Sequence, residues 1–199
     1  IDVTVKHRIG INEIDSYDFV RDFVGIVSQA GCKTFIVHAR NAVLKGLSPK
    51  ENREIPPLRY ERAYQLKKDF PELEIIINGG IKELHEIDEH LTHLDGVMLG
   101  RQAYHHPYVM ASFDSRYYGD ATIPRTRSEI IQAMIPYVHS ELLKDGPRLN
   151  SITRHMLGLV AGLPGARAFR QRLSDAKELA KGDPTLLLHA FEAMALKAS

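Results

Sequence analysis

Short strand-like runs alternate with helical segments through the first half of this chain, and this alternation limits the possible folds most strongly. The strand-like runs cover residues 2–6, 34–37, 74–77 and 96–99. The helical segments between them cover residues 15–30, 58–70 and 82–90. Strands that alternate with helices predict βαβ units and a parallel sheet. The strands begin about every 22 to 40 residues, as in a (β/α)₈ barrel, of which four units form half.

A complete doubly wound sheet of four units is the structural alternative. The lack of a glycine-rich loop after the first strand weakens that alternative, because nucleotide-binding sheets of this kind carry such a loop there. We therefore predict the fold class α/β, with the C-terminal half of a TIM (β/α)₈ barrel.

The pattern changes near residue 114, after a short helix predicted over 102–113. Strand-like runs disappear, and helices are predicted over 128–143, 152–159, 166–174 and 184–196. Glycine and proline at 146–147, 162–165 and 182–184 separate these helices. We predict that residues 1–117 form the half barrel and that residues 118–199 form a small all-α helical domain.

Positive charge is concentrated in two regions, although the net charge is only +1. Residues 144–182 contain eight Lys/Arg and three Asp/Glu, and residues 39–62 contain six and three. This pattern favours a local contact with a polyanion. No apolar run reaches the roughly 18 residues of a membrane span. The single cysteine, Cys32, excludes a disulfide framework and agrees with a cytoplasmic location.

Four polar side chains follow, or end, the four predicted strands: Lys6, His38, Asn78 and Arg101. Ligands bind at the carboxyl ends of the strands in a parallel barrel, so we expect these side chains to share one site. A lysine there suits the electron-rich edge of a flavin. His105-His106 lacks partners at ligand spacing, so we predict no metal site.

Two glycine turns indicate a phosphate site at the same ends. Asn78-Gly79-Gly80 ends the third strand, and Gly100-Arg101 ends the fourth. Glycine lets backbone N–H groups approach a phosphate closely, and arginine adds positive charge. Strands 7 and 8 of a barrel carry the usual phosphate site.

These strand ends lie within longer motifs. The first is Val3-Thr4-Val5-Lys6-His7-Arg8-Ile9-Gly10, followed by Val37-His38-Ala39-Arg40, Asn78-Gly79-Gly80-Ile81 and Gly100-Arg101. Their order and spacing resemble those of the tRNA-dihydrouridine synthases, and residues 47–58 resemble the bacterial A subfamily. The resemblance extends over nearly the whole chain.

The resemblance implies a set of cofactor contacts and a reaction. Lys6 and His38 are expected to contact the isoalloxazine of FMN, and its phosphate is expected to bind Asn78, Gly79, Gly80, Gly100 and Arg101. NADPH is the implied reductant. The implied reaction is hydride transfer to C6 of a uridine flipped out of the tRNA D-loop, at positions 20 and 20a, with proton donation from a cysteine to C5.

The resemblance also implies contacts with tRNA, and the chain departs from the family pattern in one respect. The expected tRNA-binding residues are Arg40, Lys50, Arg53, Arg154, Arg167 and Arg170. The family's cysteine lies in an Asn-x-Gly-Cys-Pro-like loop, which does not occur here. We expect this chain to be a fragment of a longer parent protein, to contain no catalytic residue, and to show no turnover on its own.

Two other functions remain open at this stage. An FMN-dependent barrel acting on a small molecule, such as a dihydropyrimidine, explains the strand ends but not the basic helical region. A non-catalytic RNA-binding module explains the basic residues but not the glycine turns. An exposed edge of a half barrel could also pair two copies of the chain.

Overall fold

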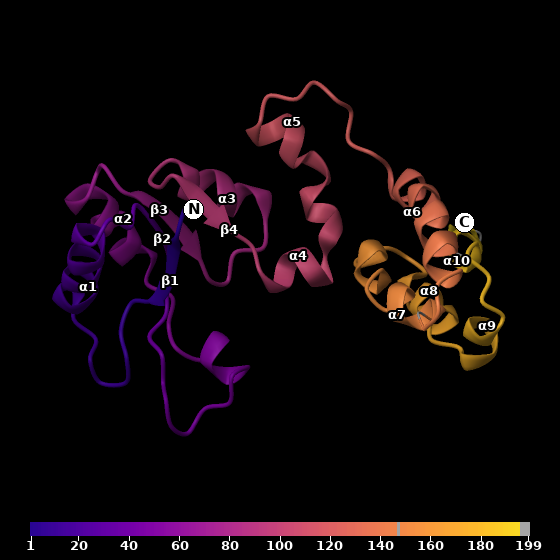
Figure 1. Cartoon of the computed structure of the whole chain (residues 1–199), viewed down its shortest axis with the longest axis horizontal. Helices are drawn as coiled ribbons and strands as arrows, with labels where there is room; N and C mark the ends of the chain where they lie inside the picture. Colours follow the sequence, from indigo (N-terminus) through magenta and orange to yellow (C-terminus); the bar gives the residue numbers. More distant parts are fainter. Residues whose placement is uncertain (147, 196–199) are drawn as a thin grey trace. The chain divides into compact units, whose positions relative to one another are not determined.

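The computed structural model describes residues 1–146 and 148–195 (Figure 1). The chain divides into two compact units, Ile1–Gly100 and Arg101–Ser199, and each is described by itself. Two positions named in the sequence analysis, residue 147 and the end of the predicted helix at residue 196, lie outside the described residues.

The first unit is built on a four-stranded parallel sheet. Its strands are β1 (Thr4–Arg8), β2 (Thr34–His38), β3 (Glu74–Asn78) and β4 (Gly96–Met98). They lie side by side in chain order. A doubly wound sheet reverses its strand order at a switch point, whereas a barrel adds each strand to the same side of the last. The observed order is therefore that of a barrel segment.

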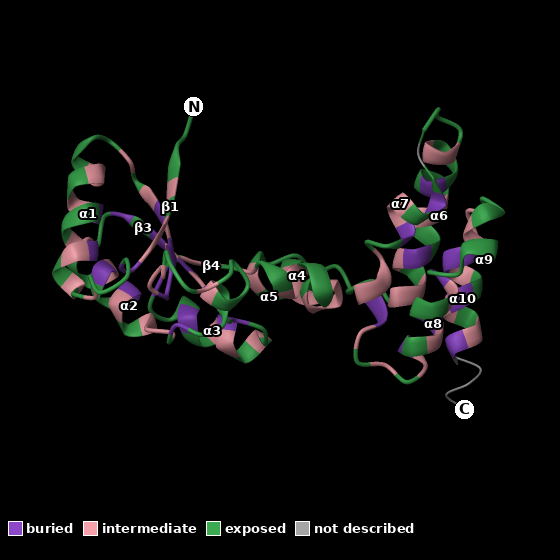
Figure 2. Ribbon diagram, turned by 90° about the horizontal axis from the view of Figure 1, so that it is seen from below, coloured by how far each residue is buried: buried purple, intermediate pink, exposed green. Residues whose placement is uncertain are grey.

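Three helices cover one face of this sheet: α1 (Tyr17–Gln29), α2 (Tyr60–Asp69) and α3 (Leu84–Leu91). Right-handed crossovers that all run in one direction place their helices on the same face, as Figures 1 and 2 show. Alternate strand residues fill this face, and Phe35, Val37, Ile75 and Ile77 are fully buried there. The opposite face carries Lys6, Ile36, Ile76 and Met98, all partly or largely exposed.

The first strand lies two residues later than the sequence pattern suggests. We expected residues 2–6, but pairing with β2 runs from Thr4 to Arg8, so Lys6 lies within the strand and not at its end. The physical reason is the partner strand, because the register Arg8–His38 recruits the polar residues His7 and Arg8 into the ladder.

The loop after β2 folds back onto the carboxyl end of β1. It contains a short 3₁₀-helix, η1 (Glu51–Arg53). Asn52 closes the loop, because its side chain accepts from Val43 N at 2.8 Å and donates to Val43 O at 2.6 Å. Arg8 donates to the backbone oxygens of Asn41 and Asn52 at 3.1 and 2.9 Å. The basic loop is thereby fixed beside the strand ends.

The second unit is helical, as predicted, but more finely divided. Its first elements are α4 (Arg101–His105), η2 (Pro107–Ser112) and α5 (Phe113–Tyr117). Next come α6 (Arg127–Leu142), α7 (Leu149–Thr153) and η3 (Leu157–Val160). The last are α8 (Ala166–Arg172), α9 (Ala176–Ala180) and α10 (Leu186–Ala195). The single helix predicted over 102–113 is therefore wrong, since Pro107 begins a separate 3₁₀-helix.

The helix predicted over 152–159 is also wrong. α7 ends at Thr153, and η3 begins at Leu157. The residues between them form a turn in which His155 bonds to Tyr104 at 2.8 Å. A tertiary contact therefore outweighs the local helical pattern.

The helical unit has its own hydrophobic core. Phe169, Leu187, Ile131 and Val160 are fully buried, and Figure 2 shows buried turns on α6, α8 and α10. Residues 101–117 belong to this compact unit, since α4 and η2 pack against η3. The functional division at 117/118 stays a prediction. No helix among the described residues is long and apolar enough to cross a membrane.

Candidate cofactor site and basic surfaces

The carboxyl ends of the strands bring Lys6 and Asn78 together. Lys6 Nζ donates to Asn78 Oδ1 at 3.0 Å, and Asn78 Nδ2 donates to the backbone oxygen of Met98 at 2.7 Å. These two bonds fix which way the Asn78 amide points, because lysine can only donate and a carbonyl can only accept. The side chains of β1 and β3 and the end of β4 thus form one connected edge.

Lys6 reaches this edge from within its strand, by virtue of its long side chain. Partial burial, followed by the charge of Arg8, lowers the pKa of Lys6. A cation held near another cation and partly removed from water favours a negative partner. The position therefore suits an electron-rich or anionic group.

The backbone of the turn after β3 strongly favours glycine. Gly79 has φ 121° and Gly80 has φ 76°, values that strain any residue with a Cβ. A Cβ on Gly80 would lie 2.7 Å from Leu58 Cδ1, and one on Gly79 would lie 3.3 Å from His38 Cε1. The backbone of the turn therefore packs closely against the side chains of Leu58 and His38.

Tyr60 holds this turn in place. Its hydroxyl donates to the backbone oxygen of Gly79 at 2.6 Å. Burial, and next the charge of Glu86, raises the pKa of Tyr60 to about 12. The phenol therefore stays protonated and able to donate across the physiological pH range. Sequence reasoning missed Tyr60, because nothing in the local pattern of α2 shows that its first residue faces a turn 19 residues later.

His38 and Arg40 lie beside the turn but are almost enclosed. His38 is 8% exposed and Arg40 9% exposed. The guanidinium of Arg40 donates to the backbone oxygen of Pro56. Only a small part of Arg40 is therefore open to tRNA, and its assignment as a tRNA contact stays a prediction, as does the contact of His38 with a flavin.

Arg8 adds a cation that the site predictions did not include. Its burial, and then the charges of Arg40 and Arg53, lower the pKa of Arg8. Lys50 and Arg53 lie exposed on the loop around η1. The carboxyl edge of the sheet is consequently rich in positive charge.

The second glycine turn spans the boundary between the two units. Gly100 ends the first unit and Arg101 begins the second, as the first residue of α4. A Cβ on Gly100 would meet no atom within 4 Å, so steric crowding does not require a glycine there. The predicted roles of Gly100 and Arg101 at a phosphate stay untested.

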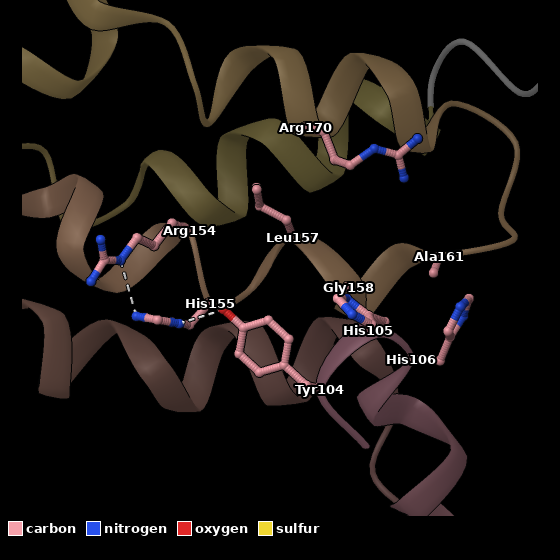
Figure 3. Close-up of a pocket in the computed structure, with 9 residues that line it drawn as sticks. All are labelled: Tyr104, His105, His106, Arg154, His155, Leu157, Gly158, Ala161 and Arg170. Atoms are coloured by element: carbon pink, nitrogen blue, oxygen red, sulfur yellow. Dashed lines mark hydrogen bonds between the residues drawn. The ribbon is translucent and has the colours of Figure 1, made fainter. Parts of the chain in front are cut away.

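The basic residues of the helical unit do not form one group. Arg154 and Arg170 line a common pocket with Tyr104, His105 and His155, shown in Figure 3. Arg167 is exposed on α8 and does not line that pocket. Among the residues that the structure describes, no cluster of three or more His, Cys, Asp or Glu side chains could hold a metal ion.

Comparison with known proteins gives consistent matches. A family model described as "Dihydrouridine synthase (Dus)" matches residues 1–195. A Pseudomonas aeruginosa protein named tRNA-dihydrouridine(20/20a) synthase is 59% identical over 174 residues, or 87% of this chain and 52% of that protein. Proteins of the same name from Synechocystis and Escherichia coli are 55% and 52% identical over 97% and 99% of this chain, and 58% and 60% of their own lengths. The chain spans somewhat more than half the length of these curated relatives.

Proposed function

The chain belongs to the dihydrouridine synthase family. From this premise we propose that it forms part of a tRNA-dihydrouridine synthase, in which it binds the phosphate of FMN and contacts tRNA. The observation that carries the proposal is the edge formed by Lys6, Asn78 and the Gly79-Gly80 turn. It combines an amine that donates to Asn78, with a pKa lowered by partial burial and by the charge of Arg8, with a turn in which a Cβ would crowd Leu58.

The residues at this edge fit FMN by their chemistry. The glycine turn presents backbone to an anion, as phosphate sites at the ends of barrel strands do. We propose that Asn78, Gly79 and Gly80, together with Gly100 and Arg101, hold the phosphate. FMN, reduced by NADPH, supplies the hydride that uridine accepts at C6.

Lys6 and His38 have different proposed tasks in the same site. Lys6 would supply positive charge to an electron-rich part of a bound flavin, and its bond to Asn78 orients the amine. His38, packed against Gly79, contacts the ring system and limits the access of water. Both tasks are positioning and electrostatic.

We propose tRNA as the substrate, with D-loop uridines 20 and 20a as targets. The relatives are named tRNA-dihydrouridine(20/20a) synthases, which supports the substrate and the two positions. Lys50 and Arg53 on the loop beside the site provide phosphate contacts, which position an RNA without reading its sequence. A flipped uridine costs a few kcal/mol of unstacking, so these contacts must offset that cost.

Cys32 does not serve as the proton donor in this proposal. It lies two residues before the second strand, and its thiol lies 3.6 Å from Val3 O and 3.4 Å from Thr34 O. It therefore lies at the amino ends of β1 and β2, opposite to Lys6 and His38. We propose that the chain alone does not reduce uridine, and addition of tRNA, FMN and NADPH to the purified chain tests this.

The decisive experiment measures dihydrouridine in tRNA by nuclease digestion and mass spectrometry. Cells that lack the gene for this protein are compared with the same cells carrying the intact gene, or the gene with Lys6→Met. We expect dihydrouridine at D-loop positions 20 and 20a to disappear, to return with the intact gene, and to return only in part with Lys6→Met. An unchanged tRNA, in a cell without an overlapping enzyme, would favour a flavoenzyme for a small molecule.

A further inference from the structure

The pocket in the helical unit is built by three segments that lie far apart in the sequence. α4 contributes Tyr104 and His105, the turn before η3 contributes Arg154 and His155, and α8 contributes Arg170. Its volume is about 370 Å³, which lies in the range of small-molecule sites. The pocket lies wholly within the second compact unit.

Gly158 allows these segments to meet. A Cβ at this position would lie 2.5 Å from the backbone oxygen of His105, so only glycine lets η3 pack directly on α4. The contact between η3 and α4, where Gly158 lines the pocket, is therefore closely packed.

The hydrogen bonds in the pocket settle the direction of each donor. Arg154 Nε, which can only donate, bonds to His155 Nε2 at 3.1 Å. That nitrogen therefore accepts, and the proton of the neutral ring lies on Nδ1, which donates to Tyr104 Oη at 2.8 Å. The hydroxyl proton of Tyr104 is consequently directed away from His155 and is available to an acceptor in a ligand.

The side chains that line the pocket favour a ligand that carries both negative charge and an aromatic ring. Among the described residues that line the pocket, none carries a carboxylate, whereas two carry a guanidinium. Tyr104 is 53% exposed, so its ring can receive a stacked group. Figure 3 shows Arg154 and Arg170 toward opposite ends of the pocket, with Leu157 between them and Tyr104 below all three in this view.

We propose that this pocket binds one unstacked nucleotide of single-stranded RNA, with its base on Tyr104 and its two flanking phosphates at Arg154 and Arg170. Stacking of a base on an aromatic side chain is typical of proteins that hold single-stranded RNA, and arginine suits the phosphates. This inference rests on the proposed function, since the loops of tRNA provide such nucleotides. The pocket uses none of the residues proposed to hold FMN.

The test uses the intact 199-residue chain and a fluorescently labelled uridine trinucleotide, with binding measured by anisotropy at several salt concentrations. We expect Arg170→Gln to weaken binding about tenfold and to reduce the salt slope by about 0.7, the value for one phosphate of a single strand. Tyr104→Leu should weaken binding about fivefold or more without changing the salt slope, because stacking releases no counterions. Tyr104→Phe, which keeps the ring, should cost less than Tyr104→Leu.

Arg167→Gln is the matched control, because Arg167 is exposed on the same helix but outside the pocket. We expect a change of less than twofold. Equal losses for Arg167→Gln and Arg170→Gln would overturn the proposal, because they would show attraction by net charge alone. An unchanged affinity in Tyr104→Leu, or equal occupancy by inorganic phosphate, would reduce the pocket to a plain anion site.

Circular dichroism checks that each variant is folded, which we expect because Tyr104, Arg167 and Arg170 are all exposed. Failure of this proposal is distinguishable from failure of the proposed function. If the gene deletion abolishes dihydrouridine while the pocket variants bind the trinucleotide normally, only the pocket assignment is wrong.

Discussion

Replacement of Gly80 by alanine tests whether the turn after β3 is as tightly specified as its geometry indicates. Gly80 has φ 76°, and the new Cβ would lie 2.7 Å from Leu58 Cδ1 and 3.3 Å from Tyr60 Oη. The positive φ costs about 1–2 kcal/mol. The contact with Leu58 adds about 1 kcal/mol, at the low end for overpacking because the end of a leucine can move.

The unfolded state offsets part of this cost. Alanine restricts the unfolded chain more than glycine does, which stabilises the fold by about 0.4–1 kcal/mol. We therefore expect Gly80→Ala to lower the free energy of unfolding by about 1–2.5 kcal/mol. Urea titration followed by far-ultraviolet circular dichroism measures it, with an unchanged m-value as the check that only stability has changed.

Two other glycines separate the contributions to that cost. Gly46 has φ 87° with no atom within 4 Å of a Cβ, so Gly46→Ala reports the backbone strain alone. Gly100 has neither a positive φ nor a near neighbour, so Gly100→Ala should be close to neutral. The expected order of destabilisation is Gly80, Gly46, Gly100. A Gly80→Ala variant as stable as Gly46→Ala would refute the claim that the turn is sterically closed.

Further predictions concern single side chains that stabilise the two units. Tyr60→Phe removes the hydrogen bond to Gly79 O and should lower the free energy of unfolding by about 1 kcal/mol. The pKa of Tyr60 is raised in the folded protein from 10.0 to about 12, so the stabilisation by this bond is present below pH 10 and is lost as the pH rises toward 12. The stabilities of wild type and variant should therefore converge in urea titrations at alkaline pH. Burial alone would raise the pKa of Asp15, but its bonds and ion pairs, chiefly with Arg62, lower it. Asp15→Asn should therefore lower the free energy of unfolding by about 0.5–1 kcal/mol at neutral pH. This loss should become smaller as the pH falls from 3.8 through the lower pKa of folded Asp15. An equal loss of stability at neutral and acid pH would contradict the role of its ion pairs. Phe169→Ala empties the centre of the helical core and should cost about 3–5 kcal/mol, and a loss below about 1 kcal/mol in thermal unfolding would contradict its place there.

The strand and helix types of the first unit follow from local pattern, whereas their exact ends do not. The runs at 34–37 and 74–77 fall within β2 and β3, because a parallel strand buried on its helix face needs apolar residues at alternate positions. β1 differs because His7 and Arg8 join the ladder only through pairing with β2. A polar residue in a strand is decided by its neighbour, which local sequence does not show.

The basic residues illustrate the same limit in the helical unit. Spacing places Arg167 and Arg170 on one helical face, but it does not show that Arg170 lines a pocket and Arg167 does not. The pocket depends on Gly158 meeting the backbone of His105, a contact between segments 53 residues apart. No window of local sequence contains both partners.

Sequence alone therefore established the alternation of strands and helices, the glycine turn at residues 79 and 80, the family, and the basic character of two regions. These properties are local, because they depend on side-chain periodicity, on the need for a positive φ, and on motifs of adjacent residues. The tertiary structure decided the remaining contacts. These are the hydrogen bond from Lys6 to Asn78, the hydrogen bond from Tyr60 to Gly79 O, and the hydrogen bonds that connect Arg154 to Tyr104 through His155. Each of these is a contact between residues distant in the chain, and such contacts form only when helices and strands have packed against their neighbours.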